Sequence, residues 1–223
     1  MLKKILRPLY VPVLKWHYET FKAPKRYRQL FREIETIGAT SILEVGTWNG
    51  ARAVQMIKKA QKVTGKDIRY IGFDLFEDLS DEMYVKEISK RPPSQDEVAD
   101  RLKVAGADVV LIKGNTMDTL PAYAEYAGKV DFVFIDGGHS AATVQSDWDA
   151  VSKLMHERTV VIFDDYWKNR PDQSAKPVVD QINQDKYDVE VLPVTDVFDN
   201  QDFGHLEINF AKVTLKKGTT AAY

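Results

Sequence analysis

The chain has 223 residues, which is room for one α/β domain and a short appendage. Hydrophobic residues make up 44% and charged residues 29% of it, which excludes a mainly disordered chain, a collagen-like fibre and an integral membrane protein. The sequence contains no cysteine, so a disulfide scaffold, a thiolate zinc site and a cysteine nucleophile are excluded as well.

The net charge of -2 hides an uneven distribution along the chain. Residues 1–32 contain nine Lys or Arg and one acid, for a net +8, and the remaining residues carry -10. Apolar and aromatic residues lie between these early basic ones. Such an arm favours a helical cap on the domain or on a second subunit of a homo-oligomer, and the alternative is an element resting on an anionic membrane surface.

A secretion signal is not expected, because Arg7, Pro8 and Pro12 interrupt the first apolar run. No stretch approaches the roughly 20 apolar residues that a membrane-spanning helix needs. We therefore expect a cytoplasmic protein, with residues 1–32 as the candidate contact to the inner face of the membrane.

The chain divides into a basic amphipathic helical arm, residues 1–37, and one larger domain, residues 38–223. The arm ends in a predicted helix, Tyr27–Ile37, because its apolar residues fall on one face and Gly38 follows it.

From Ser41 onward, short apolar runs alternate with longer helical stretches. The predicted strands are Ser41–Val45, Ile68–Phe73, Val109–Ile112, Val130–Ile135, Thr159–Phe163, Val189–Val194 and Leu206–Leu215. The predicted helices between them are Arg52–Lys62, Gln95–Ala105, Met117–Ala127, Thr143–Met155 and Ala175–Gln184. This alternation predicts a Rossmann-like, doubly wound α/β fold whose sheet is mostly parallel. The last two strands lack a helix between them and are expected to form an antiparallel hairpin.

Residues Phe76–Ser94 do not fit the alternation. The segment is long and charged and ends at Pro92 and Pro93. Connections of this length in compact domains are often lids over a ligand, and the alternative is a solvated surface insertion.

Ligands of open α/β sheets bind beyond the carboxyl ends of the strands. The first predicted strand runs into Glu44-Val45-Gly46-Thr47-Trp48-Asn49-Gly50, where the two glycines permit a sharp turn and a close approach to a ligand. The second strand ends at Asp74, a carboxylate placed to accept hydrogen bonds from the two hydroxyls of an adenosine ribose. A helix cap is the alternative role for Asp74.

The third strand leads into Lys113-Gly114-Asn115-Thr116. Asn115 is a candidate for contact with the adenine base, although ordinary turn chemistry also explains a Gly-Asn pair.

The fourth and fifth strands end in three carboxylates. Asp136 begins the segment Asp136-Gly137-Gly138-His139-Ser140, and Asp164 and Asp165 follow the fifth strand. Neighbouring carboxylates repel one another without a counter-charge, and hard oxygen ligands suit Mg²⁺ or another hard divalent cation. Turn or helix capping is the structural alternative for each of the three.

These segments together resemble a class I S-adenosylmethionine-dependent methyltransferase, and more narrowly the macrocin O-methyltransferase and methyltransferase family 24 group. The segments that carry the resemblance are SILEVGTWNG, IGFDLFEDL, LIKGNTMDTLP, DFVFIDGGHS and VVIFDDY. The resemblance implies a seven-stranded sheet and an S-adenosylmethionine site formed by Glu44, Gly46, Thr47, Trp48, Asn49, Gly50, Asp74, Asn115, Thr116 and Asp136.

The resemblance also implies that Asp136, Asp164 and Asp165 hold Mg²⁺ beside the acceptor hydroxyls. Macrocin-type enzymes typically have Asp-Gly-Asp after the fourth strand, whereas this chain has Gly138 at the second acidic position, followed by His139. The family 24 pattern is Asp-Gly-x-His. His139 and Asp136 are therefore the candidate catalytic residues, with His139 as the base, because imidazole titrates near neutral pH.

The expected activity is methyl transfer to a hydroxyl of a sugar, a glycan or a glycosylated metabolite. The alternatives are a catechol-like diol as acceptor, and a binding module that kept the fold and lost the chemistry. Nucleic acid is not an expected partner, because the sequence has no Asn-Pro-Pro-Tyr-type motif and no recognised nucleic-acid domain.

Overall fold

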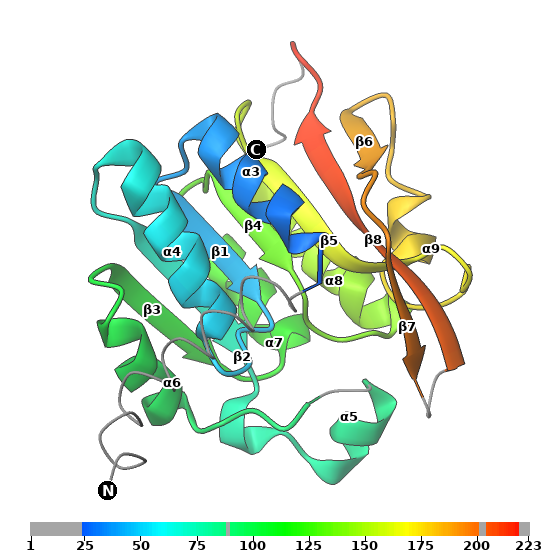
Figure 1. Ribbon diagram of the computed structural model, residues 1–223, viewed down its shortest axis with the longest axis horizontal. Helices are drawn as coiled ribbons and strands as arrows, with labels where there is room; N and C mark the ends of the chain where they lie inside the picture. Colours follow the sequence, from blue (N-terminus) through cyan, green and yellow to red (C-terminus); the bar gives the residue numbers. More distant parts are fainter. Residues whose placement is uncertain (1–23, 88–89, 201–203, 219–223) are drawn as a thin grey trace, which may run out of the picture.

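The computed structural model describes residues 24–87, 90–200 and 204–218, and these form an eight-stranded sheet between layers of helices (Figure 1). Seven strands follow the order β3-β2-β1-β4-β5-β8-β6, and β7 pairs with β8. The strands are β1 (Ser41–Val45), β2 (Arg69–Asp74), β3 (Asp108–Lys113), β4 (Phe132–Ile135), β5 (Val160–Trp167), β6 (Tyr187–Val191), β7 (Asp196–Asn200) and β8 (Gly204–Leu215).

Strands β1 to β5 are parallel, and their residues alternate between two buried faces. In β4, Phe132 and Phe134 join one apolar cluster, while Val133 and Ile135 join the cluster on the other face. Both faces of a parallel sheet are covered by helices, so these strands need continuous apolar runs rather than an alternating pattern. The predicted doubly wound fold is confirmed.

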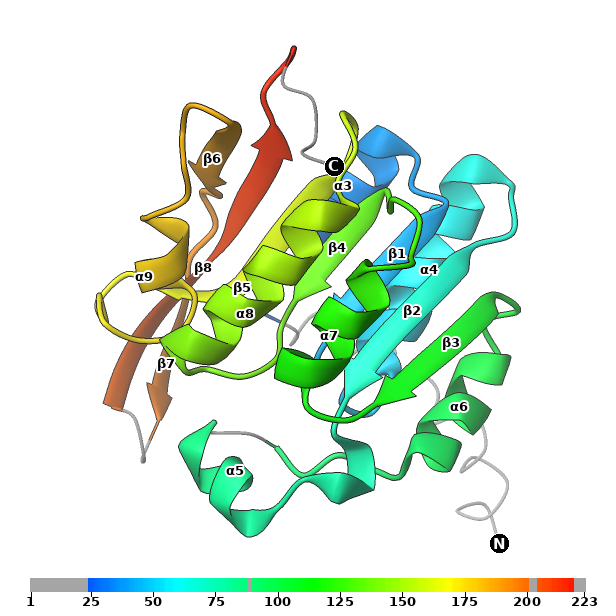
Figure 2. The same ribbon diagram turned by 180° about the vertical axis from the view of Figure 1, so that it is seen from behind.

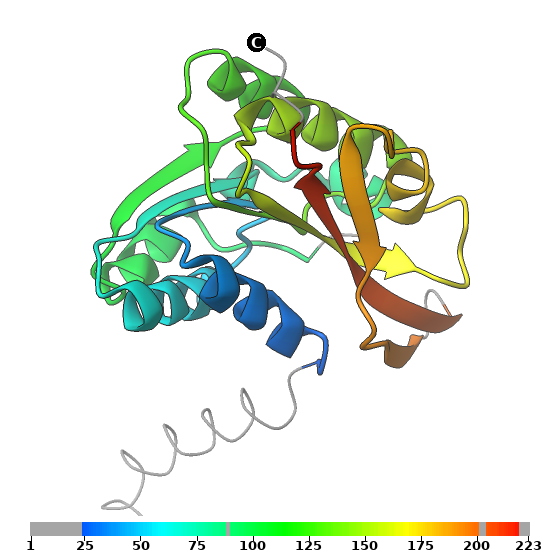
Figure 3. The same cartoon turned by 90° about the horizontal axis from the view of Figure 1, so that it is seen from above.

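Helices cover both faces of the sheet. On one face lie α3 (Tyr27–Ile37) and α4 (Ala51–Thr64), and on the other lie α7 (Thr116–Ala124) and α8 (Ala141–Val151), as Figures 1 and 2 show from opposite sides and Figure 3 shows from above. The remaining helical segments are η2 (Phe76–Asp78), α5 (Asp81–Lys86), α6 (Gln95–Lys103), η3 (Ser152–Leu154) and α9 (Lys176–Val179).

The antiparallel end of the sheet is more elaborate than a single hairpin. Strand β8 has 12 residues and lies between β5 and β6, and its first half also pairs with β7. The sequence analysis missed β7, because Asp196, Asp199 and Asn200 are poor strand formers. Long β8 supplies the hydrogen-bonding edge that makes this segment a strand.

The described part of the N-terminal arm packs on the domain. Helix α3 buries Leu30 and Ile34 in the cluster that includes Ile42 and Phe134, and Gly38 ends it in a left-handed conformation. Residues 24–37 are thus part of the same core as the sheet, and the predicted arm residues 1–23 lie outside the described residues. Within the described ranges, no helix is both long and apolar enough to cross a membrane.

Candidate functional site

The loops after β1 and β4 meet at the point where the strand order reverses, which is where open α/β sheets bind ligands. Gly46 has a φ of +89°, and a Cβ atom added there would lie 2.0 Å from the backbone oxygen of Asp136. Only glycine permits this approach. The structure therefore brings the predicted cofactor loop and the predicted acidic cluster to the same end of the sheet.

Glu44, at the end of β1, is buried and accepts a short hydrogen bond from the hydroxyl of Tyr70. Burial raises the pKa of Glu44 to about 8, although the bond from Tyr70 opposes this rise. The side chain of Thr47 lies 3.3 Å from the same hydroxyl. Glu44 and Thr47 are thus both anchored to Tyr70, while Trp48 in the same loop is 41% exposed.

Asp74 is held in place by two backbone N–H groups. Its carboxylate accepts from the N–H of Trp48 at 2.6 Å and from that of Phe76 at 3.0 Å. Each oxygen keeps a further acceptor position. The carboxylate at the end of β2 is thereby fixed beside the predicted cofactor loop, and its contact with a ribose stays a prediction.

Asn115 caps helix α7. Its side-chain oxygen accepts from the N–H of Met117 at 3.1 Å, and Thr116 is the first residue of the helix. Capping accounts for Asn115, and contact of Asn115 with adenine and of Thr116 with the cofactor stay predictions. Asn49 acts similarly before α4, where its side-chain oxygen accepts from Ala51 at 3.0 Å, and Gly50 precedes the helix with a φ of +73°.

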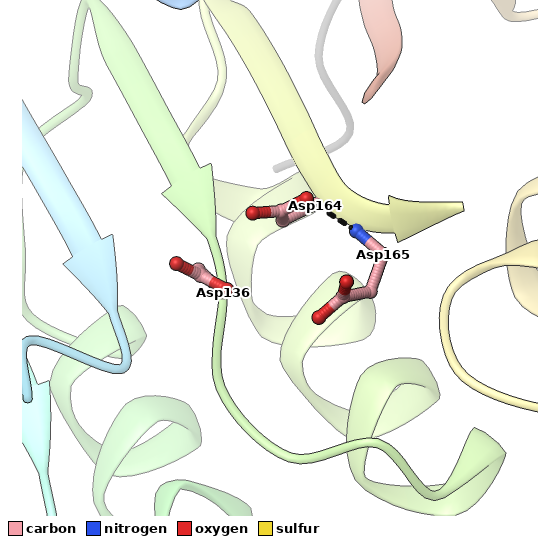
Figure 4. A group of neighbouring side chains, drawn as sticks. All are labelled: Asp136, Asp164 and Asp165. Atoms are coloured by element: carbon pink, nitrogen blue, oxygen red, sulfur yellow. Dashed lines mark hydrogen bonds between the residues drawn. The ribbon is translucent and has the colours of Figure 1, made fainter. Parts of the chain in front are cut away.

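Asp136, Asp164 and Asp165 converge, with one oxygen of each lying within 4.8 Å of the others (Figure 4). Consecutive residues of a regular strand point to opposite faces. The pairing of β5 with β8 shifts register between Phe163 and Tyr166, and Asp165 has a φ of +53°. This irregularity turns the carboxylates of Asp164 and Asp165 toward one site.

A buried arginine from the N-terminal segment lies against this cluster. The Nε and Nη2 atoms of Arg26 donate to the two oxygens of Asp164 at 2.8 and 3.0 Å, and Nη1 lies 3.3 Å from Asp196. Burial alone would lower the pKa of Arg26, but the negative charge of Asp164 raises it above its usual value. The sequence analysis missed this residue, because nine basic residues share the arm and no spacing distinguishes the buried one.

The three carboxylates differ in what already binds them. Burial raises the pKa of Asp136 well above its usual value, and the charges of Asp164 and Asp165 raise it further. Among the described residues no donor is bonded to the Asp136 carboxylate. Asp165 accepts from His139 and from the indole of Trp167 at 3.1 Å. Asp136 is therefore the most open ligand of the cluster.

His139 bridges the cluster and the segment after α5. Its Nδ1 lies 2.6 Å from the backbone oxygen of Glu87, its Nε2 lies 2.7 Å from Asp165, and its ring stacks on Trp167. Burial opposes the charged form, but Asp165 raises the pKa of His139 to about 9. Both ring nitrogens face oxygen acceptors, so the ring is an imidazolium in this arrangement. The role of His139 as a base stays a prediction, and it requires the ring to lose one proton first.

The segment predicted as a lid lies over both loops. Glu87 is buried and accepts from the N–H and Oγ of Ser140, both at 2.9 Å, and the backbone oxygen of Arg91 accepts from Trp48 at 3.2 Å. Figures 1 and 2 show α5 beyond the carboxyl ends of the strands. The segment is thus part of the site rather than a distant surface insertion.

The donor set fits a hard divalent cation in chemistry and position, since three carboxylates converge at strand ends. Asp164 is the exception, because Arg26 and Tyr27 already donate to it. The predicted Mg²⁺ ligands are therefore brought together, with Asp164 paired to Arg26.

Comparison with known proteins agrees with this geometry. A family model described as a methyltransferase domain, Methyltransf_24, matches residues 43–166, and no curated protein matches. The chain is similar in structure to the O-methyltransferase TomG from Streptomyces achromogenes, involved in tomaymycin synthesis and solved with SAM, with 16% identity, a TM-score of 0.56 and coverage of 84% of this chain and 78% of TomG.

Two further solved structures share this fold. An O-methyltransferase from Bacillus cereus in complex with SAH has 18% identity and a TM-score of 0.56, with coverage of 87% of this chain and 82% of that protein. A putative O-methyltransferase from Klebsiella pneumoniae has 15% identity and a TM-score of 0.60, with coverage of 88% and 83%.

Proposed function

This chain belongs to the methyltransferase domain family whose model matches residues 43–166, and on that premise we propose that it methylates a hydroxyl of a sugar, a glycan or a glycosylated metabolite. Family and fold together make it an S-adenosylmethionine-dependent methyltransferase. The observation that supports an oxygen acceptor is the convergence of Asp136, Asp164 and Asp165 beside the cofactor loop. The structurally similar proteins named above include O-methyltransferases.

Methyl transfer from a sulfonium is an in-line displacement, so its rate depends on holding the acceptor oxygen, the methyl carbon and the sulfur in line. The loop Glu44–Gly50 would orient the methionine part of the cofactor. The Asp74 carboxylate, already oriented by Trp48 and Phe76, would accept from the ribose hydroxyls. Glu87, which is buried against Ser140, would help to exclude water from the reacting atoms.

Asp136, Asp164 and Asp165 would hold Mg²⁺ or another hard divalent cation, which when bound supplies a Lewis acid that lowers the pKa of an acceptor hydroxyl. Asp136 and His139 are the proposed acceptors of the proton that the acceptor hydroxyl loses. Asp136 has the open carboxylate of the cluster, and His139 would accept the hydroxyl proton at Nε2 after losing its own Nε2 proton to bulk water.

Transfer of a labelled methyl group from S-adenosylmethionine to a panel of sugars, glycosides and diols tests this function. We expect methylated sugar or glycoside, and at least a 100-fold loss of turnover in Asp165→Asn with cofactor affinity within about threefold of wild type. Asp149→Asn, an exposed change on α8, is the matched control. Methylation restricted to diols that lack a sugar would contradict the proposed acceptor class.

A further inference from the structure

Arg26 and Asp164 form a buried ion pair across 138 positions of the sequence. The two side chains are only 6% and 2% exposed. This buried long-range pair holds the N-terminal segment around Arg26 at the carboxyl ends of the parallel strands. Its position is specific, because the other basic residues beside it, Lys25 and Arg28, are exposed.

The hydrogen bonds to Asp164 fill its acceptor positions. A carboxylate offers about four lone-pair positions. Oδ1 accepts from Arg26 Nε at 2.8 Å and from the N–H of Asp165 at 2.6 Å, and Oδ2 accepts from Arg26 Nη2 at 3.0 Å and from Tyr27 at 2.9 Å. A metal ion needs one of these positions, so it must displace a donor.

Of the donors to Asp164, Arg26 is the one that a bound cation would displace, because both carry positive charge. A guanidinium and a divalent cation on one carboxylate repel each other strongly in a buried site. The N–H of Asp165 is fixed by the backbone, and the Tyr27 hydroxyl carries no positive charge. The cation and Arg26 are therefore alternative counter-charges for the cluster.

A second carboxylate strengthens the hold on Arg26. Asp196 accepts from the backbone N–H groups of Lys25 and Arg26 at 2.8 and 3.0 Å, besides its contact with the guanidinium. Asp196 lies in β7 and is not one of the three converging carboxylates. It anchors the segment that carries Arg26 without being a candidate ligand itself.

We propose that Arg26 is a tethered competitor of the divalent cation, so that metal binds the acidic cluster only when the N-terminal segment releases Asp164. This inference rests on the proposed cation site. By linkage, whatever detaches Arg26 raises the affinity for metal, and metal binding loosens the segment by the same factor.

Calorimetry of the full chain with Mn²⁺ tests the competition. We expect Arg26→Met, which keeps the side-chain length and removes the charge, to bind Mn²⁺ at least tenfold more tightly than wild type. Arg28→Met, an exposed neighbour, should match wild type. Adding Asp164→Asn to Arg26→Met should abolish the gain, since it removes the contested ligand.

A second variant covers the case in which Arg26→Met does not fold. Asp196→Asn keeps Arg26 and the whole cluster but weakens the anchor, and we expect it to raise Mn²⁺ affinity at least threefold. Equal Mn²⁺ affinity in wild type and the folded variants would overturn the competition and leave the cation site standing. No Mn²⁺ binding by any of them would overturn both, while cofactor binding reports separately on the methyltransferase function.

Discussion

Asp147 shows at the scale of one residue how burial changes the chemistry of a carboxyl group. It lies on α8 and is fully buried, and the hydroxyl of Thr116 and the charge of Glu87 act on it in opposite directions. Burial raises its pKa from 3.8 to about 7. The sequence offered no signal for this residue, because an acidic position on an amphipathic helix normally faces solvent.

Asp147 makes the stability of the protein depend on pH. Between pH 3.8 and about 7 the unfolded chain has lost the proton of Asp147 while the folded protein retains it, so the free energy of unfolding falls as the pH rises through this range. We expect Asp147→Asn to be more stable than wild type by about 2 kcal/mol at pH 8, with the gain largely lost at pH 4.

Chemical denaturation at the two pH values checks this expectation. Asp149→Asn, an exposed acid on the same helix, is the control and should show no such pH-dependent difference. A gain in Asp147→Asn of the same size at pH 4 and pH 8 would rule out titration of Asp147 as its cause.

At the scale of elements, the loop between β1 and α4 is the part that the sequence predicted best. The two glycines and the preceding apolar run placed it at the carboxyl end of a central strand, and the strand Ser41–Val45 has the predicted bounds. The contact of Gly46 with the backbone of Asp136 depends on a pairing 90 residues away, so its closeness could not be predicted from local pattern.

Replacing Gly46 tests that contact. A Cβ atom at Gly46 would lie 2.0 Å from the Asp136 oxygen, whereas one at Gly65, whose φ is +64°, would meet nothing within 4 Å. We expect Gly46→Ala to lose about 3 kcal/mol or more of stability and all detectable cofactor binding, and Gly65→Ala to lose about 1 kcal/mol with binding intact. Thermal unfolding and calorimetry measure both. Equal losses of stability and binding in the two variants would show that the positive φ, and not the contact with Asp136, causes the effect.

At the scale of the whole molecule, alternating strands and helices predicted the parallel sheet and its doubly wound form correctly. The pattern missed β7 and the burial of Arg26, since both depend on partners distant in sequence: β8 for the strand, and Asp164 and Asp196 for the arginine. The convergence of Asp136, Asp164 and Asp165 was predictable because parallel strands bring their carboxyl ends to one edge. Their hydrogen-bond partners were not.

The fold also places the described N-terminal segment, residues 24–37, next to the acidic cluster. The sequence analysis treated the basic arm as a cap or a membrane contact, and its described part is a cap that reaches the acidic cluster through Arg26. Contacts of residues 1–32 with a membrane or a second subunit stay predictions. The competition proposed at Asp164 would give any such contact a route to the acidic cluster.

Binding of S-adenosylhomocysteine, measured by calorimetry with NAD as the control ligand, tests the central claim most directly. We predict micromolar binding of S-adenosylhomocysteine to wild type, none of NAD, and a loss of at least tenfold in Asp74→Ala, which removes the carboxylate held by Trp48 and Phe76. Failure of the folded wild-type protein to bind S-adenosylhomocysteine, with or without Mg²⁺, would contradict the assignment of this site to methyl transfer.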